Sequence, residues 1–161
     1  MSSKKRTKKG RPAKKGHPPL MVLRHSLDLK LQIMEAGSVT ALAKGKATPA
    51  NYNALLDMRN VTMIACWIKG ITGGAMYSYV GNIVGQVLAN VKQRFDELGK
   101  LGLSGPELEA INVFPSVYRD FWTTQPITTY KKAYDLLQQF YDGTVRGEDI
   151  GIITLGELNG D

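Results

Sequence analysis

The sequence predicts an all-α protein, a bundle of about five helices that follows a disordered basic arm and precedes a short extended tail. Three observations lead to this class. Apolar residues recur at helical spacing through most of the chain, Gly, Pro, Ser and Thr bound these stretches, and the first 19 residues contain almost nothing apolar. We therefore expect an arm over residues 1–19, a helical bundle over 20–143 and a tail over 144–161.

The first two predicted helices differ in their boundary signals. Residues 20–36 carry an apolar stripe at helical spacing that stops at Gly37, but their apolar residues also alternate, so a strand is the alternative. The second helix has Thr48 as its N-cap and Pro49 at its first position, where a missing N–H costs nothing. It is expected to end near Gly70.

Three further helices are predicted beyond Gly70. One runs from about residue 75 to 98, with its apolar side chains on one side. Ser104 and Glu107 form a capping box at the start of the next, which Pro115 should kink or split. Thr129 caps the last helix, and the residues after it are expected to form an extended tail packed on the body, or a short hairpin.

Charge separates the arm from the body. Of the 21 Lys and Arg residues, eight lie in the first 15 positions, and the first acidic residue is Asp28. Residues 20–161 hold the other 13 together with all 14 Asp and Glu, a net charge of −1, so the formal +7 of the chain comes from the arm. A basic arm on a nearly neutral body is typical of proteins that bind polyanions. The eight residues are Lys4, Lys5, Arg6, Lys8, Lys9, Arg11, Lys14 and Lys15.

Within the arm, residues 8–15 resemble an AT-hook, because a Gly10-Arg11-Pro12 core has basic residues on either side. The resemblance implies a chain that lies extended along an A·T-rich minor groove, whose narrow and strongly negative surface attracts Arg. Lys9 stands where the family usually has Arg, so one of the two groove-inserting arginines is replaced. A solubilising or targeting tail is the alternative.

The stretch from Gly37 to Ala50 is similar to a helix-turn-helix, in which a first helix, a tight turn and a Thr-capped recognition helix follow one another. The recognition helix would present Asn51, Asn53 and Arg59, since Asn can read adenine and Arg can read guanine. The connection is about two residues shorter than usual, and a lysine replaces the apolar residue at the turn. These departures favour an ordinary helical hairpin.

Residues 27–69 also resemble small uncharacterised helical proteins of bacterial phages and plasmids. Those proteins pair a short helix and a Gly-x-x-Thr-type start with a second helix rich in Leu and Asn. The resemblance implies a mobile-element context and transfers no activity or site residue.

Two patterns in the body have both a packing and a binding interpretation. Gly81, Gly85 and Ala89 recur every four residues, so a second helix could approach this face closely, either in a homodimer or within one chain. The aromatic residues of the last two helices could stack on bases, but their helical spacing favours the core.

The sequence predicts no enzyme, no cofactor and no metal site. His17 and His25 have no partner pattern, and Cys66, the one cysteine, sits in an apolar run typical of an inert buried thiol. The glycine run 70–74 lacks the lysine of a phosphate-binding loop. The uncharged stretch 70–91 is long enough for a membrane span, but its glycines and polar residues favour a packed helix and no membrane contact.

These observations predict a small nucleic-acid-binding or nucleoprotein-associated protein, with DNA favoured over RNA. The arm would contact phosphates, and the body would form a homo-oligomer or bind a protein. Two alternatives stay open: a protein-interaction module of a mobile genetic element, and a capsid or packaging protein. The expected location is cytoplasmic, in association with a nucleoid or a virion. In a eukaryotic host the expected location is nuclear, and residues 5–8 would serve as the localisation signal.

Overall fold

The computed structural model describes residues 37–152, which form an all-α bundle. Within this range the chain contains helices, turns and loops but no strand, so the predicted fold class is confirmed. The arm with its predicted disorder, the predicted helix over 20–36 and residues 153–161 of the tail lie outside the described residues.

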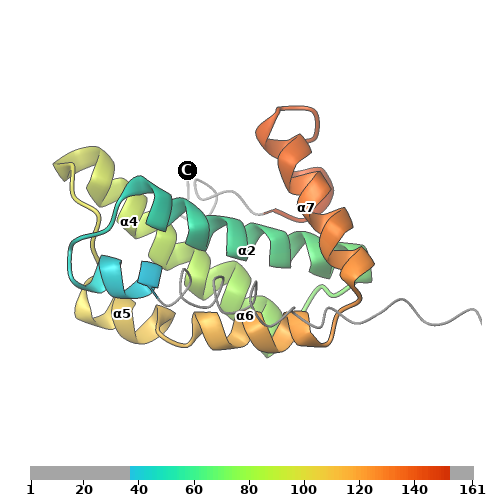
Figure 1. Cartoon of the computed structure of the whole chain (residues 1–161), viewed down its shortest axis with the longest axis horizontal. Coiled ribbons are helices and arrows are strands. Elements are labelled where there is room, and N and C mark those ends of the chain that lie inside the picture. Colours follow the sequence, from blue (N-terminus) through green and yellow to red (C-terminus); the bar gives the residue numbers. More distant parts are fainter. Residues whose placement is uncertain (1–36, 153–161) are drawn as a thin grey trace, which may run out of the picture.

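Helix α2 (Pro49–Lys69) is central and packs against both of its neighbours, the long helical rod that follows it and the last helix. Figure 1 shows α2 and α4 in the middle of the molecule, α5 and α6 end to end along one edge, and α7 crossing one end of α2. The rod consists of α3 (Ala75–Ser78), the π-helical segment η1 (Tyr79–Val84) and α4 (Gly85–Leu98). The later elements are α5 (Gly105–Ile111), α6 (Phe114–Thr123), α7 (Ile127–Tyr141) and the 3-10 turn η2 (Glu148–Ile150).

Two of the predicted helix starts are confirmed in detail. Thr48 is the N-cap of α2, and its backbone N–H donates to Oδ1 of Asn51 at 2.9 Å. Ser104 and Glu107 form the expected capping box of α5, in which the Ser104 N–H donates to Oε2 of Glu107 at 2.9 Å. In both caps a side chain accepts a hydrogen bond from a backbone N–H that has no partner within the helix. At the other end of α2, Gly70 takes the left-handed conformation (φ 70°) that suits a glycine C-cap.

Two boundary predictions are wrong. Gly37 does not end a helix, because residues 37–43 are themselves helical and bury Ser38, Val39 and Leu42 against the body. This packing outweighs the weak helix propensity of glycine. Thr129 is not an N-cap: Pro126 has that position, α7 begins at Ile127, and Thr129 is buried in the first turn.

Pro115 separates two helices as predicted, since α5 ends at Ile111 and α6 starts at Phe114 with the proline in its first turn. After α7 the chain returns to the body. Ile150 and Ile152 are 2% and 4% exposed and join the second core cluster. Over residues 144–152 the tail therefore packs on the body and contains the 3-10 turn η2, whereas the hairpin alternative falls largely on residues 153–161, outside the described residues.

The buried side chains form two clusters, one at each end of α2. The first lies between residues 37–43, the first half of α2, the rod and α5, and the second lies between the rest of α2, α6, α7 and residues 150–152. Aromatic edge-to-face contacts connect Phe114 through Tyr118 to Trp122, with ring centroids 6.3 and 6.2 Å apart. The indole N–H of Trp122 donates to Oγ1 of Thr62 at 3.3 Å, which fixes α6 on α2. These three rings pack in the core, as their spacing predicted, whereas Tyr134 and Tyr141 of α7, from the same predicted set, are exposed.

Candidate nucleic-acid interface

The basic arm lies outside the described residues, so its predicted nucleic-acid contacts stay predictions. Of the three predicted recognition residues in α2, Asn53 is exposed near the start of the helix. Asn51 is occupied by local structure: its oxygen accepts the Thr48 N–H, and its amide nitrogen donates to Oγ of Ser38 at 3.4 Å. Asn51 thus fastens the 37–43 segment to α2.

The prediction that Arg59 belongs to an exposed recognition face is wrong. Arg59 is 1% exposed, and its Nη2 donates to the Gly81 carbonyl of η1 at 2.9 Å. Burial lowers the pKa of this guanidinium to about 10. Helical geometry gives the reason, since a residue six positions after Asn53 lies about 240° around the axis.

The predicted dimer seam is contradicted as well. Gly81, Gly85 and Ala89 are all buried in the single chain. At Gly81 an added Cβ would lie 3.1 Å from Cε of Met63, so the glycine lets the rod approach α2 closely. The small residues serve packing within the chain, which was the alternative interpretation.

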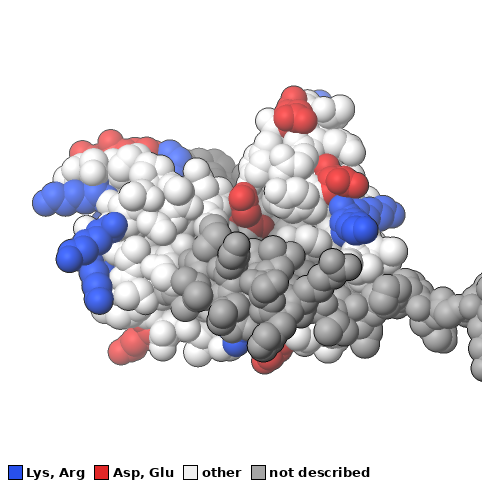
Figure 2. Space-filling view, viewed as in Figure 1, with Lys and Arg blue, Asp and Glu red and all other residues white. Residues whose placement is uncertain are grey.

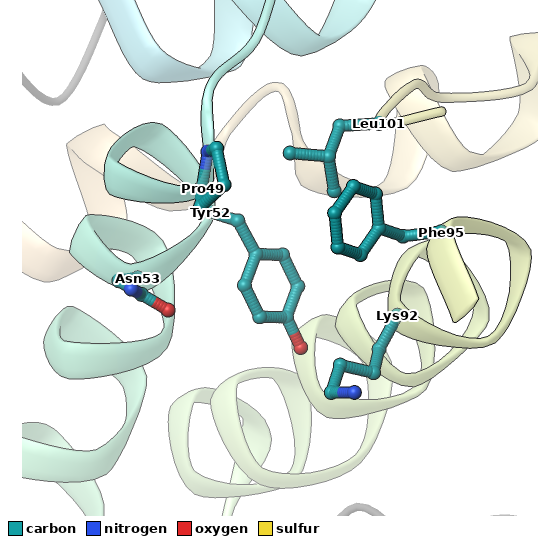
Figure 3. A pocket seen from close by; sticks show the side chains of 6 residues that line it. All are labelled: Pro49, Tyr52, Asn53, Lys92, Phe95 and Leu101. Atoms are coloured by element: carbon teal, nitrogen blue, oxygen red, sulfur yellow. The ribbon is translucent and has the colours of Figure 1, made fainter. Parts of the chain in front are cut away.

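The structure reveals a shallow pocket of about 120 Å³ between the start of α2 and the end of α4. In Figure 3 the rings of Tyr52 and Phe95 point toward one another, with the Leu101 side chain beside them. Tyr52 is held in place by its hydroxyl, which donates to the Leu88 carbonyl at 3.2 Å, and burial raises its pKa to about 12. The pocket is lined by Pro49, Tyr52, Asn53, Lys92, Phe95 and Leu101.

Exposed lysines lie on the two loops that lead to Pro49 and Leu101 of this pocket. Figure 2 shows Lys and Arg side chains, together with Asp and Glu side chains, at the end of the molecule where the 44–48 loop and the C-terminal end of α4 lie. Lys44, Lys46 and Lys100 are exposed there and form no ion pair with any of the described residues. The charge of Lys92 is offset, because its Nζ lies 2.8 Å from Asp96. We call Lys44, Lys46 and Lys100 the lysine rim.

A partly buried ion pair holds the loop that carries part of the rim. Arg94 donates to both carboxylate oxygens of Glu107, at 2.8 and 2.5 Å, and to the Gly102 carbonyl at 2.8 Å. Burial alone would raise the pKa of Glu107, but hydrogen bonds from Arg94 and Ser104 bring it below its ordinary value. The loop from α4 to α5 is therefore fixed from both sides by this pair.

Sequence reasoning did not predict this pocket, because its residues are far apart in the chain. Lys92 and Phe95 are three apart on one helix, which indicates a shared face. That Tyr52, 40 positions earlier, and Leu101 complete the wall depends on how α2, α4 and the following loop pack. No local pattern carries that information.

Reactive groups are scarce in the described part of the chain. Cys66 is buried, and this burial raises the pKa of its thiol to about 11, so the thiolate nucleophile is suppressed. Among residues 37–152, no group of three or more His, Cys, Asp or Glu residues is placed to hold a metal ion. None of the described helices combines the length and the hydrophobicity needed to cross a membrane.

One further polar contact links α2 to α7. The hydroxyl of Tyr141 donates to Oδ1 of Asp57, and burial raises the pKa of both side chains. This hydrogen bond holds the end of α7 against α2.

Comparison with protein-family models, with curated proteins and with solved structures finds no match to this chain. The charge, pocket and packing of the chain itself are therefore the guides to its function.

Proposed function

We propose that this protein binds nucleic acid, with DNA preferred over RNA, through the basic arm of residues 4–15. The observation that carries the proposal is the division of charge: eight Lys and Arg residues in the first 15 positions, with no acidic residue before Asp28. By contrast, residues 37–152 hold 11 Lys and Arg against 10 Asp and Glu. The helical body supplies a compact carrier for the arm, and we assign it no catalytic role.

Counterion release sets the expected strength of this binding. Each phosphate contact on duplex DNA contributes about −0.9 to the slope of log K against log salt, so eight contacts give a slope of about −7. Binding through the arm is then tight at low salt and weak at high salt. Such contacts position the protein but carry little sequence information.

The Gly10-Arg11-Pro12 core adds a preference for A·T-rich sites to the proposal. A thin, extended Gly-Pro frame enters a narrow minor groove, and the groove's negative potential favours Arg over the more strongly hydrated Lys. With Lys9 in place of a second arginine, we expect this preference to be modest. A DNA-associated location, in a nucleoid, a virion or a nucleus, follows from the same proposal.

The test is fluorescence anisotropy with the full-length protein and short duplex DNA or RNA at three salt concentrations. A variant with all eight arm Lys and Arg replaced by Gln should lose most of the binding and most of the salt dependence. A matched control, in which the arm's Lys and Arg are exchanged for one another, keeps the charge and should keep the affinity. Unchanged binding by the Gln variant would overturn the proposal.

A second candidate function, contact with another protein, is favoured by aromatic side chains on α7. Tyr134 and Tyr141 are 45% and 47% exposed, and Tyr130 stacks on Tyr134 with ring centroids 6.1 Å apart. Exposed aromatic side chains are enriched in protein interfaces. Sedimentation of the protein without nucleic acid tests self-contact: Tyr134→Glu should dissociate an oligomer formed through this face, and a wild type that stays monomeric at high concentration would exclude one.

A further inference from the structure

The pocket between α2 and α4 has the size of a single six-membered ring. Its volume is about 120 Å³, and an apolar cavity of about 150 Å³ is known to hold benzene. Two of its walls are the aromatic rings of Tyr52 and Phe95, which offer flat surfaces to a planar ligand (Figure 3). A single-ring pyrimidine base matches this volume more closely than a two-ring purine does.

The walls of the pocket are apolar, but two polar side chains lie at its opening. Asn53 is exposed at the opening and carries both a donor and an acceptor, and Lys92 adds an ammonium group. These groups can bond to the exocyclic oxygen and the ring nitrogen of a pyrimidine while its faces contact Tyr52 and Phe95. Tyr52 itself is fixed by its bond to Leu88, so the pocket wall is formed before a ligand arrives.

The lysine rim supplies the charge that a nucleotide's phosphate needs. Lys46 lies three residues before Pro49, and Lys100 directly precedes Leu101, so both lysines leave the chain next to pocket walls. The loop that carries Lys100 approaches the helical segment just before Lys44, because a Cβ on Gly102 would lie 3.8 Å from the Leu42 carbonyl. The loops that carry the lysine rim therefore adjoin the pocket, at an end of the molecule where Figure 2 shows both basic and acidic side chains.

We infer that this end of the body binds single-stranded nucleic acid, with one pyrimidine base in the pocket and the neighbouring phosphates on Lys44, Lys46 and Lys100. The inference rests on the proposed nucleic-acid function and extends it from the arm to the body. A stacked aromatic site beside basic side chains is a recurring solution for single strands. Since a base in a duplex is paired and stacked, an intact duplex cannot use the pocket.

The test is a series of NMR titrations of the ¹⁵N-labelled full-length protein with hexathymidylate, hexaadenylate and thymidine 5′-monophosphate. Hexathymidylate should shift the Asn53 side-chain amide and the backbone amides of residues 92–101 in a saturable way, and hexaadenylate should shift them less. Asn53→Trp, which fills the pocket from an exposed position, should remove these shifts and leave those of the arm in place.

A second measurement addresses the lysine rim. Replacing Lys44, Lys46 and Lys100 by Gln should reduce the magnitude of the salt slope for hexathymidylate by about 2, from about 0.7 per phosphate contact on a single strand. The matched control replaces three exposed lysines on other surfaces and removes the same charge, so it should leave the slope nearly unchanged. These control positions are Lys69, Lys131 and Lys132.

The outcomes separate this inference from the proposed function. Shifts confined to the arm, equal shifts with the adenine strand, or equal effects of the two lysine triplets would overturn the inference and leave arm binding intact. Equal affinity for thymidine monophosphate would overturn the single-strand assignment in favour of a free nucleotide. If the arm Gln variant binds duplex DNA normally while the pocket shifts persist, the proposed function falls and the pocket stands.

Discussion

The ion pair between Arg94 and Glu107 can be tested with one substitution. This substitution removes the charge of Glu107 but keeps the capping box of α5. Glu107→Gln loses the carboxylate that accepts two guanidinium bonds, at 2.8 and 2.5 Å. Glutamine is also suited to the third position of a capping box, so the bond to Ser104 can persist. The substitution therefore isolates the electrostatic contribution of the pair.

The burial of the two partners sets the magnitude. A hydrogen bond to a charged group is worth about 1.5–3 kcal/mol, so two such bonds bring an upper bound of about 3–6 kcal/mol. The Glu107 side chain is 11% exposed, but that of Arg94 is 34% exposed and can be solvated once the carboxylate is gone. We expect Glu107→Gln to lower the free energy of unfolding by about 2 kcal/mol, and Tm by about 8 °C for a domain near 100 residues.

The effect should depend on pH with a defined sign. The pKa of Glu107 in the folded protein is below its ordinary value of 4.5. The stabilisation is therefore complete above about pH 5 and is lost as the pH falls through the folded pKa. The difference between wild type and Glu107→Gln should shrink in the same acid range.

Urea denaturation followed by far-ultraviolet circular dichroism measures this difference, with Asp96→Asn as the matched control. Asp96 pairs with Lys92, but the two side chains are 56% and 54% exposed. Solvent-exposed pairs contribute about 0–1 kcal/mol, so the control should change stability by less than about 0.5 kcal/mol. Equal losses in the two variants would refute the claim that burial gives the Glu107 pair its strength.

Three more predictions concern buried groups. Thr62→Val should cost about 1–3 kcal/mol in urea denaturation, because it leaves the indole N–H of Trp122 without its acceptor, and Thr62→Ser, which keeps the hydroxyl, should cost less. Tyr52→Phe should cost about 1 kcal/mol at pH 7 by losing the bond to the Leu88 carbonyl. Because burial raises the pKa of Tyr52 to about 12, the wild type should lose stability from pH 10 toward pH 12, and this variant should lose less. Cys66 should react with a chromogenic disulfide reagent only after unfolding, since its thiol is buried and the thiol pKa is raised to about 11.

The helix boundaries that sequence predicted correctly are those set by local chemistry. Thr48 with Pro49, and Ser104 with Glu107, act through residues within one turn, so their effect is visible in the chain itself. The predictions of a helix end at Gly37 and an N-cap at Thr129 were wrong, because packing overrides the local preference of each residue. Gly37 begins the described part of a helical segment anchored by buried neighbours, and α7 takes its cap from Pro126.

The candidate interface on the body was less accessible to sequence reasoning. The pocket joins Tyr52 to Phe95 and Leu101, which meet only because α2 crosses α4 and the next loop folds back. The lysine rim is likewise split between residues 44–46 and Lys100. Charge counting over the body finds near balance, and only the three-dimensional arrangement reveals that three lysines without an ion pair to residues 37–152 share one end.

Arg59 shows why the charges of this body cannot be assigned from sequence alone. A basic residue in a predicted recognition helix suggests a nucleic-acid contact, yet this guanidinium is 1% exposed and donates to the Gly81 carbonyl in the π-helical segment η1. A π-helical turn shifts the hydrogen-bond register of the rod, and a buried carbonyl beside such a turn is costly to leave unpaired. Arg59 supplies the donor from α2, at the expense of its own hydration. Its charge therefore serves the packing of the rod and is not available to an external phosphate.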